Sequence, residues 1–329
     1  MKIYNVAVVG CGVIAPNHLY AIDRLDGLKL ACVCDIDEEK AKNTAEKYGV
    51  KYYTDYKEMA ENEQLDGVHI CLPHYLHKEV TVYFLEKKIP VLCEKPMAIN
   101  SADGQEMIDV AEKYSTKMDI IFQTRVGSAA KTVFEAVKSG KVGKVQRIFA
   151  QVKWKRDKEY YNNGKWRSIL AQAGGGSLIN QAIHTLDLAR LMANSEVKTV
   201  AAQVTNLDHD YIEVEDTVNA VVTFENGTIL TLFSTNNNFE SELPSIKAVC
   251  ENGIIELTGS DAVITLNDGT VIKNDRDKET FFGVKEEYGT SHIAQVHRFY
   301  FGSEDEIKEN VNQALKTQKL VDEIYKSRK

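Results

Sequence analysis

Residues that could move a proton occur at two points of the sequence. The first is Cys-Glu-Lys-Pro-Met-Ala, residues 93–98, directly after the apolar run 89–92. Burying a glutamate or a lysine is costly unless the charge is paired or used. A strand that ends in Glu94 and Lys95 is therefore a candidate functional site. A plain surface turn is the alternative, because X-Pro dipeptides often mark the exit of a strand.

The second point is the segment 174–188, in which three glycines lead into an apolar helical pattern. Three glycines cost conformational entropy, which indicates that the backbone closely approaches another group there. Asn180 and His184 are four residues apart, so they share one face of the expected helix. A proton-transferring histidine and a buried histidine satisfied by a neighbour are equally supported by this spacing.

The first 122 residues alternate strand-like and helix-like segments. We expect strands at 3–9, 28–34, 51–54, 65–72, 89–93 and 118–122, and helices at 14–25, 37–48, 55–62, 76–87 and 101–114. Such alternation is typical of a parallel sheet covered on both faces. The sequence therefore predicts an α/β fold whose N-terminal domain, residues 1–122, is a doubly wound Rossmann domain.

The turn after the first strand has the pattern of a dinucleotide-binding loop. Gly10 permits a tight turn, Gly12 lets a pyrophosphate approach the backbone, and Ala15 is small enough for the helix to pack on the strand. The N–H groups at the start of the helix would face the phosphates. The predicted cofactor contacts of this loop are Gly10, Gly12, Val13 and Ile14.

Asp35 ends the second expected strand, where a carboxylate would bind the adenosine ribose and favour NAD over NADP. Its alternative role is a helix N-cap, but Asp37 fits that role better. The loops after the fourth and fifth strands end at the same edge of the sheet as the glycine loop. Further cofactor contacts are predicted there at Leu72, Pro73, His74, His77, Glu94 and Lys95.

Beyond residue 122 the alternation stops and longer strand patterns appear. They cover 145–154, 199–205, 218–224, 228–234, 246–250 and 254–257, with Asn-Gly turn signals at 226–227 and 252–253 and closing helices at 291–300 and 305–325. Asn-Gly favours tight antiparallel hairpins. We predict an open, largely antiparallel sheet flanked by helices over residues 123–329.

The loop before the three glycines mixes cations with aromatic residues. The cations are Lys153, Lys155, Arg156, Lys158, Lys165 and Arg167, and the aromatics are Trp154, Tyr160, Tyr161 and Trp166. Such a loop could bind a phosphorylated or nucleotide-linked sugar, or stack on pyranose and nicotinamide rings. A solvated surface is the alternative, because Asp157 and Glu159 lie among the cations.

Composition excludes several classes of function. The chain has 329 residues, 43% of them apolar and 27% charged, and a net charge of −8 with no long basic tract, which argues against nucleic-acid binding. No signal peptide or membrane-length apolar window is present, so a soluble, cytoplasmic protein is expected. The six cysteines and the pair His74 and His77 lack the spacing of metal ligands, so no metal site is predicted.

These motifs together resemble the Gfo/Idh/MocA oxidoreductases over the whole chain. The shared motifs are the GxGxxA loop followed by His18, Pro73 with His77, Glu94-Lys95-Pro96, and the GGGxLxNQxxHxxD stretch that ends at Asp187. The resemblance implies a Rossmann domain followed by an α/β domain, residues 123–329, for substrate binding and oligomerisation, whose open sheet carries subunit contacts. It also implies a homodimer or homotetramer.

The resemblance implies roles for individual residues as well. Lys95 would lie beside the nicotinamide and the substrate hydroxyl, and burial would lower its pKa. The proline after it would fix the turn, and the peptide bond before that proline is often cis in the family. His184 would be the base in oxidation and the acid in reduction. The implied substrate contacts are Lys95, Arg125, Trp154, Trp166, Asn180, Gln181 and His184, and Trp166 would also contact the cofactor.

One departure from the family pattern concerns Asn180, where many members have an aspartate. Asparagine can orient an imidazole or bind a hydroxyl but gives no charge to stabilise an imidazolium, so we expect His184 to be a weaker base and Lys95 to take more of the proton transfer. A subgroup that acts largely on sugars and their derivatives shares the Asn-Gln pair and Trp166-Arg167.

The sequence therefore predicts an NAD-dependent oxidoreductase for a secondary alcohol or ketone of a sugar, polyol or sugar derivative. Two alternatives stay open. One is a non-catalytic regulator that binds NAD. The other is a glycoside hydrolase that oxidises, eliminates and re-reduces with no net change of NAD.

Overall fold

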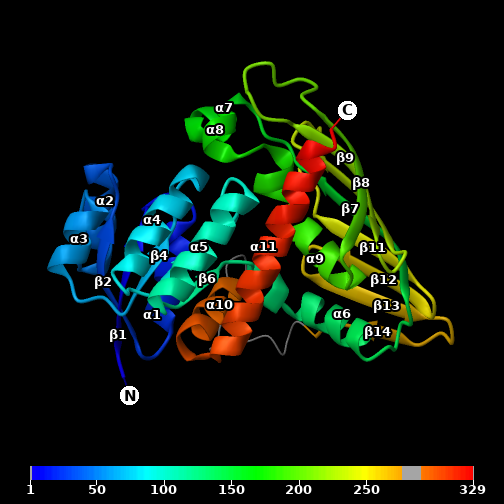
Figure 1. Ribbon diagram of the computed structural model, residues 1–329, viewed down its shortest axis with the longest axis horizontal. Helices are drawn as coiled ribbons and strands as arrows, with labels where there is room; N and C mark the ends of the chain where they lie inside the picture. The colour runs from blue at the N-terminus through cyan, green and yellow to red at the C-terminus, as the bar shows by residue number, and fades with distance from the viewer. Residues whose placement is uncertain (1, 276–289, 329) are drawn as a thin grey trace. The chain divides into compact units, whose positions relative to one another are not determined.

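The structure is a computed structural model that describes residues 2–275 and 290–328 (Figure 1). The described residues fall into two compact units. Unit 1 contains the chain up to Gln123 and the segment from residue 290 to Leu315, and unit 2 contains the chain from Thr124 and again from Lys316. Helix α11 (Glu304–Lys326) therefore contributes its first part to unit 1 and its last part to unit 2.

Unit 1 is built on a six-stranded parallel sheet with the order β3-β2-β1-β4-β5-β6. Its strands are β1 (Tyr4–Val9), β2 (Leu28–Cys34), β3 (Lys51–Tyr53), β4 (Gly67–Ile70), β5 (Val91–Cys93) and β6 (Met118–Ile120). The strand order reverses direction between β1 and β4, which is where doubly wound sheets bind ligands at the carboxyl edge. The predicted doubly wound domain is confirmed.

Five helices connect these strands: α1 (Ala15–Arg24), α2 (Glu38–Tyr48), α3 (Tyr56–Asn62), α4 (His74–Glu86) and α5 (Ser101–Tyr114). As expected, the side chain of Asp37 caps α2 by accepting the N–H of Lys40. Helix α10 (Thr290–Phe301) also belongs to this unit, because it packs against α1 through a shared apolar core that includes Phe299. Nothing in the position of α10 along the sequence indicated this.

Unit 2 is built on an eight-stranded sheet with the order β14-β13-β12-β11-β7-β10-β9-β8. Its strands are β7 (Val145–Lys153), β8 (Val197–Thr205), β9 (Thr217–Phe224), β10 (Ile229–Thr235), β11 (Ser245–Cys250), β12 (Gly253–Thr258), β13 (Asp261–Leu266) and β14 (Val271–Lys273). Strand β7 pairs in parallel with β10, while the other neighbours are antiparallel. Both Asn-Gly hairpins are confirmed. The short strands β13 and β14 were not expected from the sequence.

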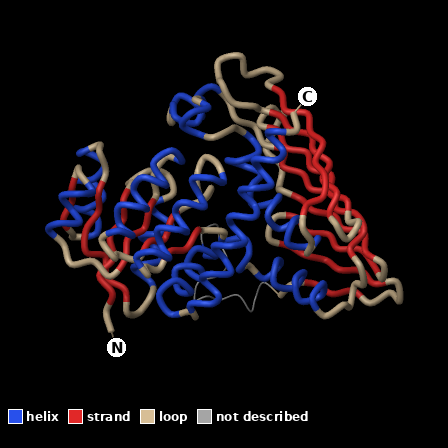
Figure 2. Tube along the Cα trace, viewed as in Figure 1, coloured by secondary structure: helices blue, strands red, loops and turns tan. Residues whose placement is uncertain are grey.

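Helices cover one face of this sheet. Helix α9 (Ile183–Ala193) packs on β7, β10 and β11, and α6 (Ser128–Lys138) packs on β13. Between β7 and α9 lie α7 (Lys158–Asn162), a 3-10 turn η2 (Lys165–Ser168), α8 (Leu170–Ala173) and a π-helix η3 (Ser177–Ala182). In Figure 2 the sheet of unit 2 is drawn in red, with α6 and α9 in blue on one side of it. Phe149, Val221 and Ile229 are exposed on strands of this sheet.

Candidate active site

The glycine loop leaves room for a phosphate at the start of α1. Gly10 has φ +95°, and a Cβ there would lie 2.4 Å from the carbonyl oxygen of Cys71, so only glycine fits. A Cβ at Gly12 would meet no atom of the described residues within 4 Å. Ile14 is the N-cap residue of α1, and its side chain makes no hydrogen bond to the N-terminus of this helix. Pro16 has no N–H, and the N–H groups of Ala15 and Asn17 already donate to the carbonyl oxygens of Gly12 and Ile14, so the open backbone at Gly12 is the part of this loop that fits the approach of a dinucleotide pyrophosphate.

Asp35 lies beside this loop, where β2 ends. Its carboxylate accepts the N–H of Cys11 at 2.7 Å and the N–H of Asp37 at 2.9 Å. The first bond ties Asp35 to the glycine loop, and a carboxylate has further lone pairs for ribose hydroxyls. The next side chain, Ile36, is 92% exposed and carries no positive charge. These residues fit NAD better than NADP.

The turn that carries Lys95 is held by buried groups. Lys95 is half-buried, while Glu94 before it and Pro96 after it are buried. A carboxylate oxygen of Glu94 accepts the backbone N–H of Lys95 at 3.1 Å. The peptide bond from Lys95 to Pro96 is cis, as the resemblance implied. The lysine therefore leaves the carboxyl edge of the sheet from a backbone that is fixed on its N-terminal side.

His77 fixes the other side of this turn. Its ring is fully buried, with Nδ1 2.7 Å from the carbonyl oxygen of Pro96 and Nε2 2.9 Å from that of Leu72. Burial lowers the pKa of His77, and the two carbonyl acceptors oppose this effect. The ring therefore ties the loop after β4 to the Lys95 turn. Of the other predicted residues in that loop, Leu72 and Pro73 are half-buried and His74 is buried.

Two of the three glycines of unit 2 pass against the protein's own residues. Gly175 has φ +150°, and a Cβ there would lie 2.0 Å from the hydroxyl of Tyr325. A Cβ at Gly176 would lie 1.9 Å from the carbonyl oxygen of Glu215. The buried carboxylate of Glu215 accepts the N–H groups of Gly176 and Leu178 at 2.7 and 2.9 Å and the hydroxyl of Tyr325 at 3.0 Å. The expected close approach is therefore real, and it fixes the start of the π-helix.

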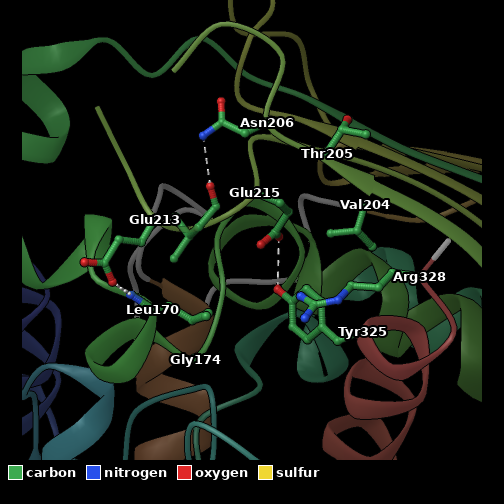
Figure 3. A pocket seen from close by; sticks show the side chains of 10 residues that line it. Leu170, Gly174, Val204, Thr205, Asn206, Glu213, Glu215, Tyr325 and Arg328 are labelled. Carbon is green, nitrogen blue, oxygen red and sulfur yellow. Dashed lines mark hydrogen bonds between the residues drawn. The ribbon is translucent and has the colours of Figure 1, made fainter. Parts of the chain in front are cut away.

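A shallow pocket of about 290 Å³ lies beside this glycine segment. Figure 3 shows the carboxylate of Glu215 and the hydroxyl of Tyr325 joined in it, with Arg328 nearby. Its lining residues are Leu170, Gly174, Val204, Thr205, Asn206, Glu213, Val214, Glu215, Tyr325 and Arg328. Apart from Gly174, which opens the glycine segment, none of them is among the residues that the sequence predicts for catalysis or binding.

The π-helix and the first turn of α9 carry the predicted polar residues of unit 2. The side-chain amides of Asn180 and Gln181 both donate to the hydroxyl of Tyr160, at 3.1 and 2.8 Å. His184 lies in the first turn of α9, with Nδ1 3.4 Å from the hydroxyl of Thr124. π-Helices often occur at functional sites. Tyr160 was expected only as one of the aromatic residues of its loop, because no sequence signal shows its hydrogen bonds.

Arg125 anchors helix α9 through Asp187. Its guanidinium donates to both carboxylate oxygens of Asp187, at 2.7 and 2.6 Å, and the Thr317 hydroxyl donates to the same carboxylate at 2.5 Å. Asp187 is fully buried. Burial would raise the pKa of the Asp187 carboxyl, but Arg125 and, less strongly, Arg190 hold it below its usual value. Arg125 was expected as a substrate contact, and in the structure its guanidinium is bound to this carboxylate.

The cations of the loop before the glycines stack on its aromatic rings. The Arg156 guanidinium lies 4.6 Å from the ring centre of Trp154 and 5.0 Å from that of Tyr160. The Arg167 guanidinium lies 4.6 Å from the ring centre of Trp166 and 5.3 Å from that of Tyr160. These cation–π contacts hold the three rings in one cluster.

Two family models match the chain. Residues 4–122 match the oxidoreductase family with an NAD-binding Rossmann fold, and residues 130–256 match the GFO/IDH/MocA C-terminal domain. Among the described residues, no helix has the length and apolar character that a membrane span needs.

Individual relatives are named for sugar and polyol chemistry. Myo-inositol 2-dehydrogenase of Thermotoga maritima is 29% identical over 68% of this chain and 66% of its own length. D-glucoside 3-dehydrogenase of Escherichia coli K12 is 30% identical over 69% of each chain. About a third of each relative therefore lies outside the match.

A solved structure matches nearly the whole chain. The WlbA dehydrogenase of Chromobacterium violaceum, in complex with NADH and UDP-GlcNAcA, has a TM-score of 0.87 at 26% identity, covering 99% of this chain and 94% of its own. The glycine loop and the Lys95 turn lie within the residues that match the NAD-binding Rossmann family model. The GGG segment lies within the match to the GFO/IDH/MocA C-terminal domain. The chain belongs to the Gfo/Idh/MocA oxidoreductase family.

Proposed function

We propose that this protein is an NAD-dependent dehydrogenase or reductase that acts on a secondary alcohol or ketone of a sugar, polyol or sugar derivative. The family and the names of its relatives support this class of reaction. The observation that carries the proposal is the Lys95 turn. A half-buried lysine leaves the carboxyl edge of the NAD-binding sheet, with Glu94 bound to its N–H and His77 bound to the next carbonyl.

The residues of the chain then have distinct tasks. When bound, NAD accepts or donates the hydride at C4 of its nicotinamide ring. Lys95 donates a hydrogen bond to the reacting oxygen and stabilises negative charge on it. His184 takes the hydroxyl proton in oxidation and returns it in reduction. Thr124 beside Nδ1 orients the imidazole, since Asn180 gives it no negative charge.

The substrate is the part of the proposal with the widest choice. The clustered rings of Trp154, Tyr160 and Trp166 suit a pyranose face. The exposed Lys155 and Lys165 in the same loop would suit a phosphate or carboxylate, and the C. violaceum relative was solved with a nucleotide sugar. Both neutral and anionic sugars are therefore candidates.

We also propose that the sheet of unit 2 forms the subunit contact of a homodimer or homotetramer. Phe149, Val221 and Ile229 are 43%, 44% and 40% exposed on strands of this sheet, and exposed apolar side chains of this size favour an interface. Light scattering of the wild type and of Val221→Glu tests this. A single monomeric mass for the wild type would refute it.

NADH formation at alkaline pH tests the function, with inositols, aldoses, sugar phosphates, nucleotide sugars and glycosides as substrates. We expect one group to give NADH, and Lys95→Ala to lower the rate about 10³-fold with little change in NAD affinity. An unchanged rate would refute the role of Lys95. Free sugar released from a glycoside without net NADH would favour the redox-neutral hydrolase, and silence with NAD still bound would favour the regulator.

A further inference from the structure

A chain of buried side chains ends on Glu94. His18 of α1 and His292 of α10 both place Nε2 beside one Glu94 oxygen, at 3.0 and 3.2 Å. His18 Nδ1 lies 3.0 Å from Nδ1 of His69 on β4, whose Nε2 lies 3.1 Å from the hydroxyl of Tyr300. All five residues are at most 5% exposed. Histidines this deep in a Rossmann core need a reason, because each polar atom there must find a partner.

The donors and acceptors of this chain are assigned from the charge state of its groups and from the pairing of each donor with one acceptor. Burial would raise the pKa of Glu94, but hydrogen bonds from His18 and His292 hold it well below its usual value, so the carboxylate is the acceptor. Burial lowers the pKa of His18 and of His69, so both rings are neutral. His18 Nε2–H then donates to Glu94, His69 Nδ1–H donates to His18, and the Tyr300 hydroxyl donates to His69. Each contact pairs one donor with one acceptor.

We infer that Glu94 is a positioning residue for Lys95, and that His18 and His292 hold its carboxylate in place. One Glu94 oxygen receives the two imidazoles and the other receives the N–H of Lys95. Three donors thus converge on one carboxylate. A glutamine could accept from only one side, because its NH₂ group would face either the imidazoles or the lysine amide, donor against donor.

A metal ion is the alternative occupant of this cluster. One ligand atom from each of His18, Glu94 and His292 lies within 4.8 Å of the others, as metal ligands would. A bound metal would replace both imidazole N–H groups as the partner of the carboxylate. The chain from Tyr300 to Glu94 has an N–H at His18 Nε2, whereas a metal there would reverse the chain, with His18 Nδ1–H donating to His69 and His69 Nε2–H donating to Tyr300. Metal analysis of the purified protein separates the two, and stoichiometric metal would overturn the inference.

The kinetic measurements rest on the proposed function. Chemical labelling of Lys95 is added because it needs no substrate. Four proteins are compared: wild type, Glu94→Gln, His292→Leu and His292→Gln, whose amide can still donate to Glu94. Each is measured for turnover, KM, NAD dissociation constant and thermal unfolding. Acetylation of Lys95 by acetic anhydride is then measured by peptide mass spectrometry, with the exposed Lys42 as internal reference.

For turnover, we expect Glu94→Gln to lower kcat about 100-fold and His292→Leu about tenfold, with NAD affinity within about threefold, because a small misplacement of a reacting group costs this much. His292→Gln should restore most of the loss. A Glu94→Gln protein that turns over like the wild type, or equal losses in the two His292 variants, would overturn the inference.

For labelling, Glu94→Gln and His292→Leu should change the Lys95 to Lys42 ratio about threefold or more, since the lysine is no longer held. If the wild type turns over no substrate, the proposed function fails while this ratio still decides the positioning role. An unchanged ratio in folded variants would refute that role.

Discussion

Replacement of Arg125 by methionine should destabilise unit 2 strongly, because it leaves the Asp187 carboxylate buried without its main partner. Asp187 is 0% exposed and the Arg125 side chain 8%, with contacts of 2.6 and 2.7 Å. Breaking a buried ion pair on one side costs about 3–5 kcal/mol. Thr317 still donates to the carboxylate and Arg190 lies 3.7 Å away, so we expect the low end, about 3 kcal/mol at pH 7.

The loss of folding free energy caused by Arg125→Met should increase as the pH rises. In the wild type the folded-state pKa of Asp187 is lowered, so the stability that the ion pair gives is fully present above the unfolded pKa of about 3.9 and is lost as the pH falls from there through the folded-state pKa. In the Arg125→Met variant burial dominates and raises the pKa, so the penalty appears only as the pH rises above about 4. The difference between the two proteins should therefore be largest near pH 7, smaller near pH 4 where the variant's penalty is gone, and smallest below the lowered folded-state pKa of Asp187.

Urea unfolding followed by tryptophan fluorescence measures this difference. Both tryptophans, Trp154 and Trp166, lie in unit 2, so the signal reports that unit. Lys247→Met is the matched control, because it removes a cation from the ion pair with Glu256 in the same unit at 51% and 54% exposure. Exposed pairs contribute little. A cost for Arg125→Met no larger than that of the control, or one that is equal at both pH values, would refute the reasoning.

Two further predictions concern the cofactor. Gly12→Ala should leave thermal unfolding unchanged but weaken NAD binding about tenfold or more, since the added Cβ meets no described atom and occupies the approach of the phosphates. Calorimetry of unfolding and of NAD binding checks this, and an NAD affinity equal to that of the wild type would contradict it. Asp35→Ser combined with Ile36→Arg should shift the ratio of NAD to NADP affinity towards NADP, because the carboxylate goes and a guanidinium replaces an exposed apolar side chain; an unchanged ratio would mean that Asp35 does not face the ribose.

The sequence predicted the N-terminal fold well because its signals are local. The apolar runs, the glycine loop and the N-cap Asp37 each act within a few residues, and the observed strands and helices follow the expected ranges closely. Strands β13 and β14 were not expected from the sequence, and the structure adds them to the sheet as antiparallel partners of β12 and of each other. The π-helix was missed because the spacing of Asn180 and His184 fits an ordinary helix equally well.

The site was predicted less completely because its fixing contacts join residues far apart in the chain. Glu94 could be named as unusual, but its partners His18 and His292 lie 76 and 198 residues away. Asp187 could be named as part of a motif, but Arg125 and Thr317 lie 62 and 130 residues away. One sequence carries no signal that joins such positions.

The carboxylates of Glu94 and Asp187 are both buried, and each connects folding stability with the position of a predicted functional residue. Each is buried near a predicted proton-transfer residue: Glu94 precedes Lys95, and Asp187 lies three residues after His184. A buried carboxylate cannot shift without leaving charge or N–H groups unpaired, so it fixes the nearby backbone more firmly than apolar packing would. Apolar replacements of both partners can be neutral for stability. If positioning is the reason that these charges are buried, Arg125→Met combined with Asp187→Leu should regain most of the folding stability and still lose turnover, and regained turnover would refute that reason.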